Sequence, residues 1–113
     1  MKAFKLPGIE PVVEITLDKA REWLRIDGED NDEIIEGLLQ ACPHYIEVTT
    51  GYPWGLQPYE QLSETVTRLL MLLWYNAEQS EAERLQRAID NLLKVITIRA
   101  REIPDWVLQK YNG

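Results

Sequence analysis

The sequence contains one cysteine, one histidine and one phenylalanine among 113 residues. A single cysteine, Cys42, excludes an internal disulfide and fits a reducing compartment. Together Cys42 and His44 are too few to build a zinc site, which needs three or four protein ligands. The longest uninterrupted apolar run, Leu69 to Tyr75, is far shorter than the ~20 residues that a membrane span requires. The opening MKAFKLPGIEP has no apolar signal-peptide core, so we expect a cytoplasmic protein without membrane contact.

Catalytic motifs are also missing. Two positions apart on a helix, Cys42 and His44 point to different sides and cannot form a nucleophile–base pair. No glycine-rich phosphate loop or Gly-x-Ser-x-Gly elbow occurs. The acidic segment from Asp27 to Glu33 invites comparison with a calcium loop, but its sixth position is Asp32 rather than Gly and its twelfth is Leu38 rather than Glu. We therefore expect no catalytic residue, no cofactor and no metal site.

Charge is unevenly distributed along the chain. The net charge is −7, and residues 1–80 carry six Lys or Arg against fourteen Asp or Glu, whereas residues 81–113 carry six against five. An acidic chain does not bind nucleic acid by general phosphate neutralisation, which needs clustered Lys and Arg. The asymmetry is either a matter of solvated helix faces or a sign that unlike charges meet head to tail between identical subunits.

Helical spacing predicts two helices near the N-terminal end, over about residues 17–25 and 31–50. Thr16 is placed to cap the first, and Asp30 with Glu33 is placed to form a capping box for the second. Gly28 and Gly51 are placed to end a helix or its turn in a left-handed conformation. The second helix carries a wide apolar stripe that consists of Ile34, Ile35, Leu38, Leu39, Cys42, Tyr45 and Ile46.

Two further helices are predicted over about residues 59–79 and 81–101. Pro43 removes one backbone bond inside the second helix, so we expect a bend near residues 39–43. The loop at residues 51–58 has strong turn chemistry, and its Trp54 could plug the core or enter a partner's groove; we favour the core. Residues 1–14 and 104–113 read as extended terminal arms. The sequence thus predicts one all-α domain over residues 1–113, a small bundle of about four helices with two arms.

The third helix has more apolar circumference than one small domain can cover. Its inward stripe is accompanied by other apolar side chains over residues 69–75, and a helix that is apolar all round is buried all round. Either the other helices wrap it completely, or another copy of the chain covers it. We favour the second possibility, and the residues predicted to mediate self-association are Leu69, Met71, Leu72, Trp74 and Tyr75.

The N-terminal half resembles the head–tail connector (adaptor) proteins of long-tailed bacteriophages and prophages. The shared elements are Ile15-Thr16-Leu17, Ala20, Leu24-Arg25-Ile26-Asp27, the acidic run from Glu29 to Glu33, Ile34-Ile35, Ala41, Tyr45-Ile46-Glu47 and Thr50-Gly51. The resemblance covers roughly a third of the chain well and weakens after Pro58. Pro43 and Ala77-Glu78 depart from the family pattern.

This resemblance implies a structural virion protein. Such connectors form an oligomeric ring between the portal and the tail or stopper proteins, at the head–tail junction, and extend the DNA channel after packaging; they are made in the cytoplasm of the bacterial host. An acidic lumen would repel DNA phosphates, and the candidate lumen residues are Glu29, Asp30 and Asp32.

The alternative function is a small DNA-packaging or regulatory protein that binds DNA through a helix–turn–helix formed by the first two helices. This function requires a basic second helix. Residues 31–50 contain no Lys or Arg, so we expect no sequence-specific binding to nucleic acid.

Overall fold

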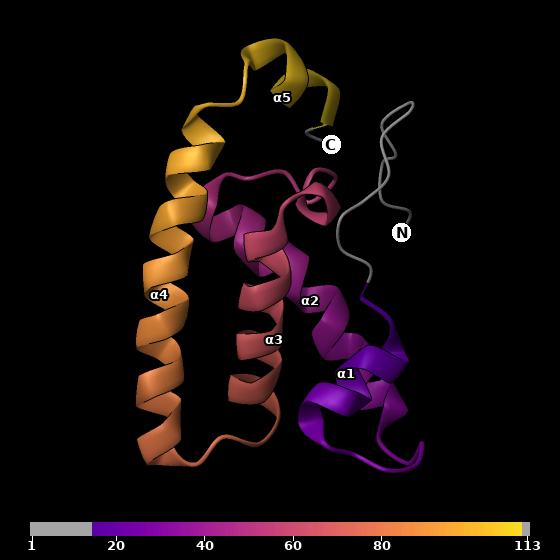
Figure 1. Cartoon of the computed structure of the whole chain (residues 1–113). Helices are drawn as coiled ribbons and strands as arrows, with labels where there is room; N and C mark the ends of the chain where they lie inside the picture. Colours follow the sequence, from indigo (N-terminus) through magenta and orange to yellow (C-terminus); the bar gives the residue numbers. More distant parts are fainter. Residues whose placement is uncertain (1–14, 112–113) are drawn as a thin grey trace.

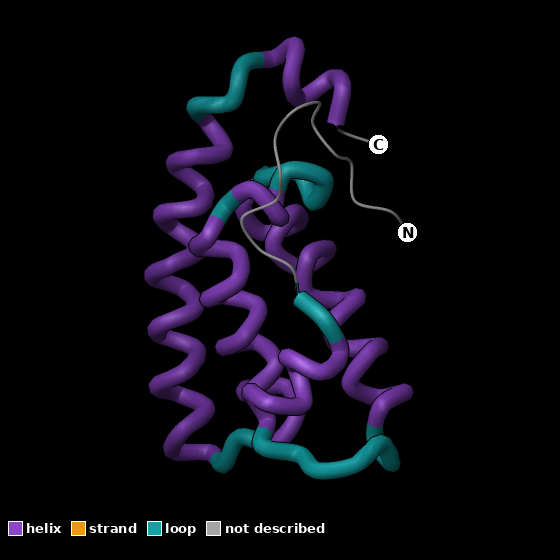
Figure 2. The backbone as a smooth tube through the Cα atoms, turned by 45° about the vertical axis from the view of Figure 1, so that its right-hand side comes forward, coloured by secondary structure: helices purple, strands orange, loops and turns teal. Residues whose placement is uncertain are grey.

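Five α-helices and one short 3₁₀ helix form the fold in a computed structural model, which describes residues 15–111 (Figures 1 and 2). In chain order they are α1 (Leu17–Leu24), α2 (Asp32–Thr50), η1 (Gln57–Tyr59), α3 (Gln61–Asn76), α4 (Gln79–Arg101) and α5 (Asp105–Tyr111). No strand occurs within this part of the chain, which confirms the predicted all-α bundle. The predicted N-terminal arm, residues 1–14, lies outside the described residues. None of the described helices is long and apolar enough to cross a membrane.

The helix ends follow the local chemistry of the sequence in three of four predicted places. The Thr16 hydroxyl accepts a hydrogen bond from the backbone N–H of Lys19 at 3.1 Å, as expected of an N-cap. Gly51 ends α2 with a positive φ of 80°. Gly28 has a φ of 95° in the turn after α1, but the residue that caps α1 is Arg25, which itself adopts the left-handed region.

The start of α2 differs from the prediction. The capping box of Asp30 and Glu33 does not form, because the N-cap is Asn31 and its side chain makes no capping bond. The amide of Asn31 instead donates a hydrogen bond to the hydroxyl of Tyr75 at 2.8 Å. A tertiary contact therefore competes successfully with a local cap.

The C-terminal elements differ in extent from the expectation. The helix predicted over about residues 59–79 is shorter in the structure, where α3 spans Gln61–Asn76. Tyr59 instead ends η1, and Glu60 between the two elements is the N-cap of α3. The residues after Pro104 were predicted to be an extended tail, yet Asp105–Tyr111 forms the short helix α5. Proline is compatible with a position just before a helix, where no N–H is needed.

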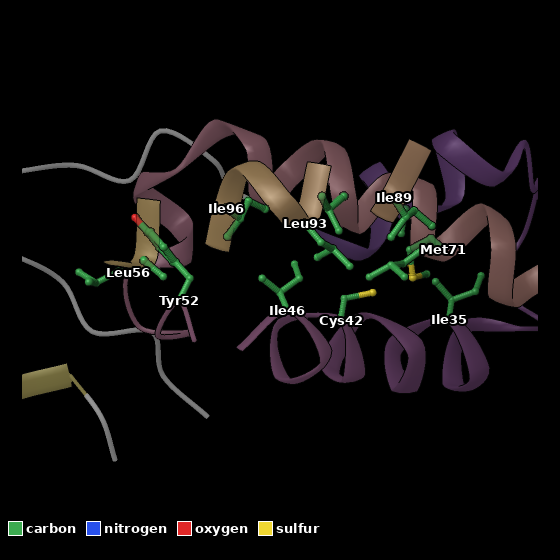
Figure 3. Close-up of a cluster of buried hydrophobic side chains, with 13 residues drawn as sticks. Ile35, Cys42, Ile46, Tyr52, Leu56, Met71, Ile89, Leu93 and Ile96 are labelled. Atoms are coloured by element: carbon green, nitrogen blue, oxygen red, sulfur yellow. The ribbon is translucent and has the colours of Figure 1, made fainter. Parts of the chain in front are cut away.

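The core lies where α2, α3 and α4 face one another, and α1 closes one side. Ile35, Cys42 and Ile46 of α2 point toward Met71, Ile89, Leu93 and Ile96 of α3 and α4 (Figure 3). Ala20 is the fully buried residue of α1. Full burial of an aliphatic side chain of this size stabilises a fold by about 1.5–3 kcal/mol. The bundle therefore depends on contacts between helices more than on the intrinsic stability of any one helix.

The loop after α2 closes one end of the core. Its buried side chains are those of Tyr52, Pro53 and Leu56, whereas Trp54, which we expected in the core, is only half-buried. Gln57 is also buried, and its amide donates to the backbone carbonyls of Pro43 at 2.8 Å and Tyr52 at 3.4 Å.

Pro43 lies inside α2, which continues through it from Asp32 to Thr50. Thus Gln57 ties the loop to the middle of this helix. The predicted bend at residues 39–43 stays a prediction.

Replacement of Gln57 by Ala should reduce the free energy of unfolding by about 1–3 kcal/mol, because the buried carbonyl of Tyr52 and the partly buried carbonyl of Pro43 lose a donor. Urea denaturation followed by circular dichroism measures the change. Gln40→Ala on the exposed side of α2 is the matched control, with an expected effect within about 0.5 kcal/mol. Equal effects of the two variants would show that the loop is not held in this way.

Candidate assembly surfaces

The acidic turn between α1 and α2 contains both free and paired carboxylates. Glu29 and Asp30 are exposed. Asp32 is half-buried, and both of its carboxylate oxygens accept hydrogen bonds from Nη1 of Arg21 at 2.7 Å. Arg21 also pairs with Asp18, and the hydrogen bond with Asp32 is the main cause that raises the Arg21 pKa. Of the three predicted lumen residues, two are therefore free to present charge, and Asp32 is engaged within its own chain.

The predicted self-association residues of α3 differ in their accessibility. Met71 is fully buried in its own chain, with 0% of its surface exposed, so it has no area to offer a partner. Leu69, Leu72, Trp74 and Tyr75 are half-buried. Leu69, Trp74 and Tyr75 pack against the buried core, and Leu72 is not among the side chains that do so. Self-association through these four stays a prediction.

The most exposed large apolar side chains lie on other helices. They are Ile34 (59% exposed) and Val48 (71%) on α2, Val95 (43%) and Ile98 (55%) on α4, and Trp106 (69%) on α5. Ile34 belongs to the apolar stripe predicted for this helix, whereas Val48 lies outside that stripe. Their spacing could have revealed them, since residues 34 and 48 are separated by two heptads and lie on one face.

The outward surfaces of α2 and α4 differ in the sign of their net charge. α2 contains Asp32, Glu33, Glu36 and Glu47 and no Lys or Arg. A helix of this kind would place carboxylates against DNA phosphates, which argues against a helix–turn–helix reader formed by α1 and α2. α4 exposes five basic side chains, which are Arg84, Arg87, Lys94, Arg99 and Arg101, and three acidic ones, which are Glu81, Glu83 and Asp90.

Groups with reactive chemistry are scattered or buried. Cys42 is fully buried, and desolvation raises the pKa of its thiol to about 12. His44 is exposed. Residues 15–111 hold no cluster of His, Cys, Asp and Glu that could bind a metal ion. The described part of the chain thus offers apolar and charged surfaces for contact with other molecules.

The native protein should react very slowly with a thiol reagent at pH 8. A pKa of about 12 leaves roughly a thousandfold less thiolate than the ordinary value of 9.0, and burial adds a steric barrier. Absorbance with Ellman's reagent measures the rate, and the same chain in urea should react at the rate of a free cysteine. Rapid labelling without denaturant would place Cys42 at the surface and contradict the packing of α2.

A family described as phage gp6-like head-tail connector protein matches residues 14–103. No curated protein and no solved structure matches the chain.

Proposed function

The chain belongs to the phage gp6-like head-tail connector family, and we propose that it is a structural virion protein that forms an oligomeric ring at the head–tail junction. The family match carries this proposal, because it spans residues 14–103 of a 113-residue chain. In this arrangement the ring contacts the portal protein on one side and tail or stopper proteins on the other. The protein is made in the bacterial host and retained in the virion.

The physical properties of the subunit support a role in assembly. The described chain is a small helical bundle with principal extents of 42 × 28 × 20 Å. It leaves large apolar side chains exposed on three helices, and exposed apolar surface on a small protein marks a contact with another molecule when it forms a patch. The connector family is structural rather than enzymatic.

The negative charge of the subunit supports a role beside DNA that does not involve binding it. In the proposed ring, Glu29 and Asp30 line the extended DNA channel, and Asp32 supports them through its pair with Arg21. Carboxylates repel phosphates, so DNA would pass without adhering.

Deletion of the gene should give DNA-filled heads and separate tails that do not join. Electron microscopy of the particles together with plaque counts measures this, and wild-type protein supplied from a plasmid should restore tailed particles. Normal numbers of tailed, infectious particles without the protein would refute the proposed role.

A further inference from the structure

Along the outside of α2 runs an apolar strip that its own chain leaves uncovered. Ile34, Gly37, Ala41 and Val48 are all exposed, and their spacing of i, i+3, i+7 and i+14 places them on one helical face. Beside this strip, one position earlier in each case, runs a polar row that consists of Glu33, Glu36, Gln40 and Glu47. Strip and row together form what we call the α2 face.

A similar arrangement of opposite charge runs along the outside of α4. Val95 and Ile98 are its exposed apolar side chains, with Ala88 and Asn91 on the same helical face. One position earlier than 88, 91 and 95 lie Arg87, Asp90 and Lys94, and the same row continues to Arg101. All four are exposed, so the row carries three cations and one carboxylate and is basic on balance. We call this surface the α4 face.

The charged rows of both faces have no neutralising partner within the described chain. Among residues 15–111, Glu33 and Glu36 on the α2 face form no ion pair, and neither do Arg87, Lys94 and Arg101 on the α4 face. Elsewhere Lys19, Arg21 and Arg99 are paired, the last with Glu60 at 3.3 Å, whereas Arg25, Arg68 and Arg84 form no ion pair within residues 15–111. The α2 face therefore offers an apolar strip beside an acidic row, and the α4 face offers an apolar strip beside a row of net positive charge.

Charge decides which faces can meet. Two α2 faces would bring acidic rows together, and two α4 faces would bring basic rows together, both of which are repulsive. We propose, as the contact on which the ring inferred above rests, that the α2 face of one copy packs against the α4 face of the next. This pairing covers both apolar strips and pairs acidic with basic side chains.

The two faces point away from each other, because α2 and α4 bury their opposite sides in the same core (Figures 1 and 3). A contact between different surfaces of identical chains is heterologous, and it propagates from copy to copy until a ring closes. A pair of copies joined by one such contact leaves one α2 face and one α4 face exposed, and these recruit further copies.

The position of the charged rows also fixes the relative direction of the helices. Both rows precede their apolar strips by one residue, so they lie on the same flank of each helix. When the two apolar strips are packed against each other, the two charged rows lie on the same side of the contact only if the helices run in opposite directions. The contact is therefore antiparallel, and the N-terminal end of the α2 strip at Ile34 lies near the C-terminal end of the α4 strip at Ile98.

Gly37 is consistent with a close approach of a second helix. It lies in the middle of α2 without a positive φ, and a Cβ added there would meet no atom of its own chain within 4 Å. Neither backbone conformation nor internal packing thus requires glycine, which is unfavourable inside a helix relative to Ala. A helix from another copy that crosses at this point would use the space.

Charge reversal tests the contact directly. Glu33→Lys/Glu36→Lys on the α2 face and Arg87→Glu/Lys94→Glu on the α4 face should each weaken self-association about tenfold or more. Analytical ultracentrifugation and native mass spectrometry over a range of concentrations at low salt measure this. Because all four residues are exposed, circular dichroism should show unchanged folding. An equimolar mixture of the two variants should recover large assemblies, since reversed faces are again complementary.

Leu72→Asp on α3 distinguishes this contact from the self-association predicted through α3, because it should leave association unchanged if the α2 and α4 faces carry the contact. Loss of association in Leu72→Asp alone, equal association of all variants, or a wild-type chain that stays monomeric to millimolar concentration would overturn the proposal. Failure of this contact is distinguishable from failure of the proposed function, because the deletion experiment reports tail attachment independently of which surface is used.

Gly37→Ala should have opposite effects on the subunit and on its assembly. The midpoint of urea denaturation should rise because Ala favours the helix, while association weakens because the added methyl group separates the two helices. A more stable subunit with unchanged or stronger association would show that no helix crosses at Gly37.

Discussion

The packing of α3 between α2 and α4 is the constraint on which the rest of the structure depends. Leu70 and Met71 of α3 are buried at the centre of the bundle. α3 contacts both α2 and α4, and these two helices also contact each other. Two specific contacts hold α2 in this position. The rings of Tyr45 and Trp74 pack edge to face with their centroids 5.5 Å apart, and the side-chain amide of Asn31 donates a hydrogen bond to the hydroxyl of Tyr75. Because these contacts orient α2, they also determine which of its sides is left for solvent or a partner.

Helical spacing and end signals were sufficient to predict the helices of the bundle. Thr16 and Gly51 are clear end signals, because few other residues can do what they do. The Thr16 side chain caps the first N–H groups of α1, and Gly51 adopts the left-handed conformation that ends α2. Asp30 and Glu33 also fitted a local rule, but Asn31 formed a long-range hydrogen bond that no local pattern encodes. Similarly, turn chemistry predicted the loop after α2, and it could not decide that Tyr52 rather than Trp54 would be buried.

The candidate surfaces were harder to predict for a physical reason. An apolar stripe that spans nearly half of a helix can be one wide buried face or two narrower faces side by side, and the sequence of one chain does not distinguish them. Ile34 and Ile35 are neighbours in that stripe, yet one is largely exposed and the other is fully buried. The position of α2 against α3 and α4 decides which part of the apolar stripe is buried and which part is exposed.

The shared core of α2 and α4 has a consequence for the size of any object built through their outer sides. In a closed circle of identical units, the turn from one unit to the next equals the angle between its two joining surfaces, and that angle sets how many units complete the circle. Here the angle is held by buried side chains such as Ile46 and Ile96, which belong to the core rather than to either surface. In the proposed arrangement, the packing of the core therefore determines the number of copies in the ring. A change of one methyl group in the core could then alter the diameter of the channel.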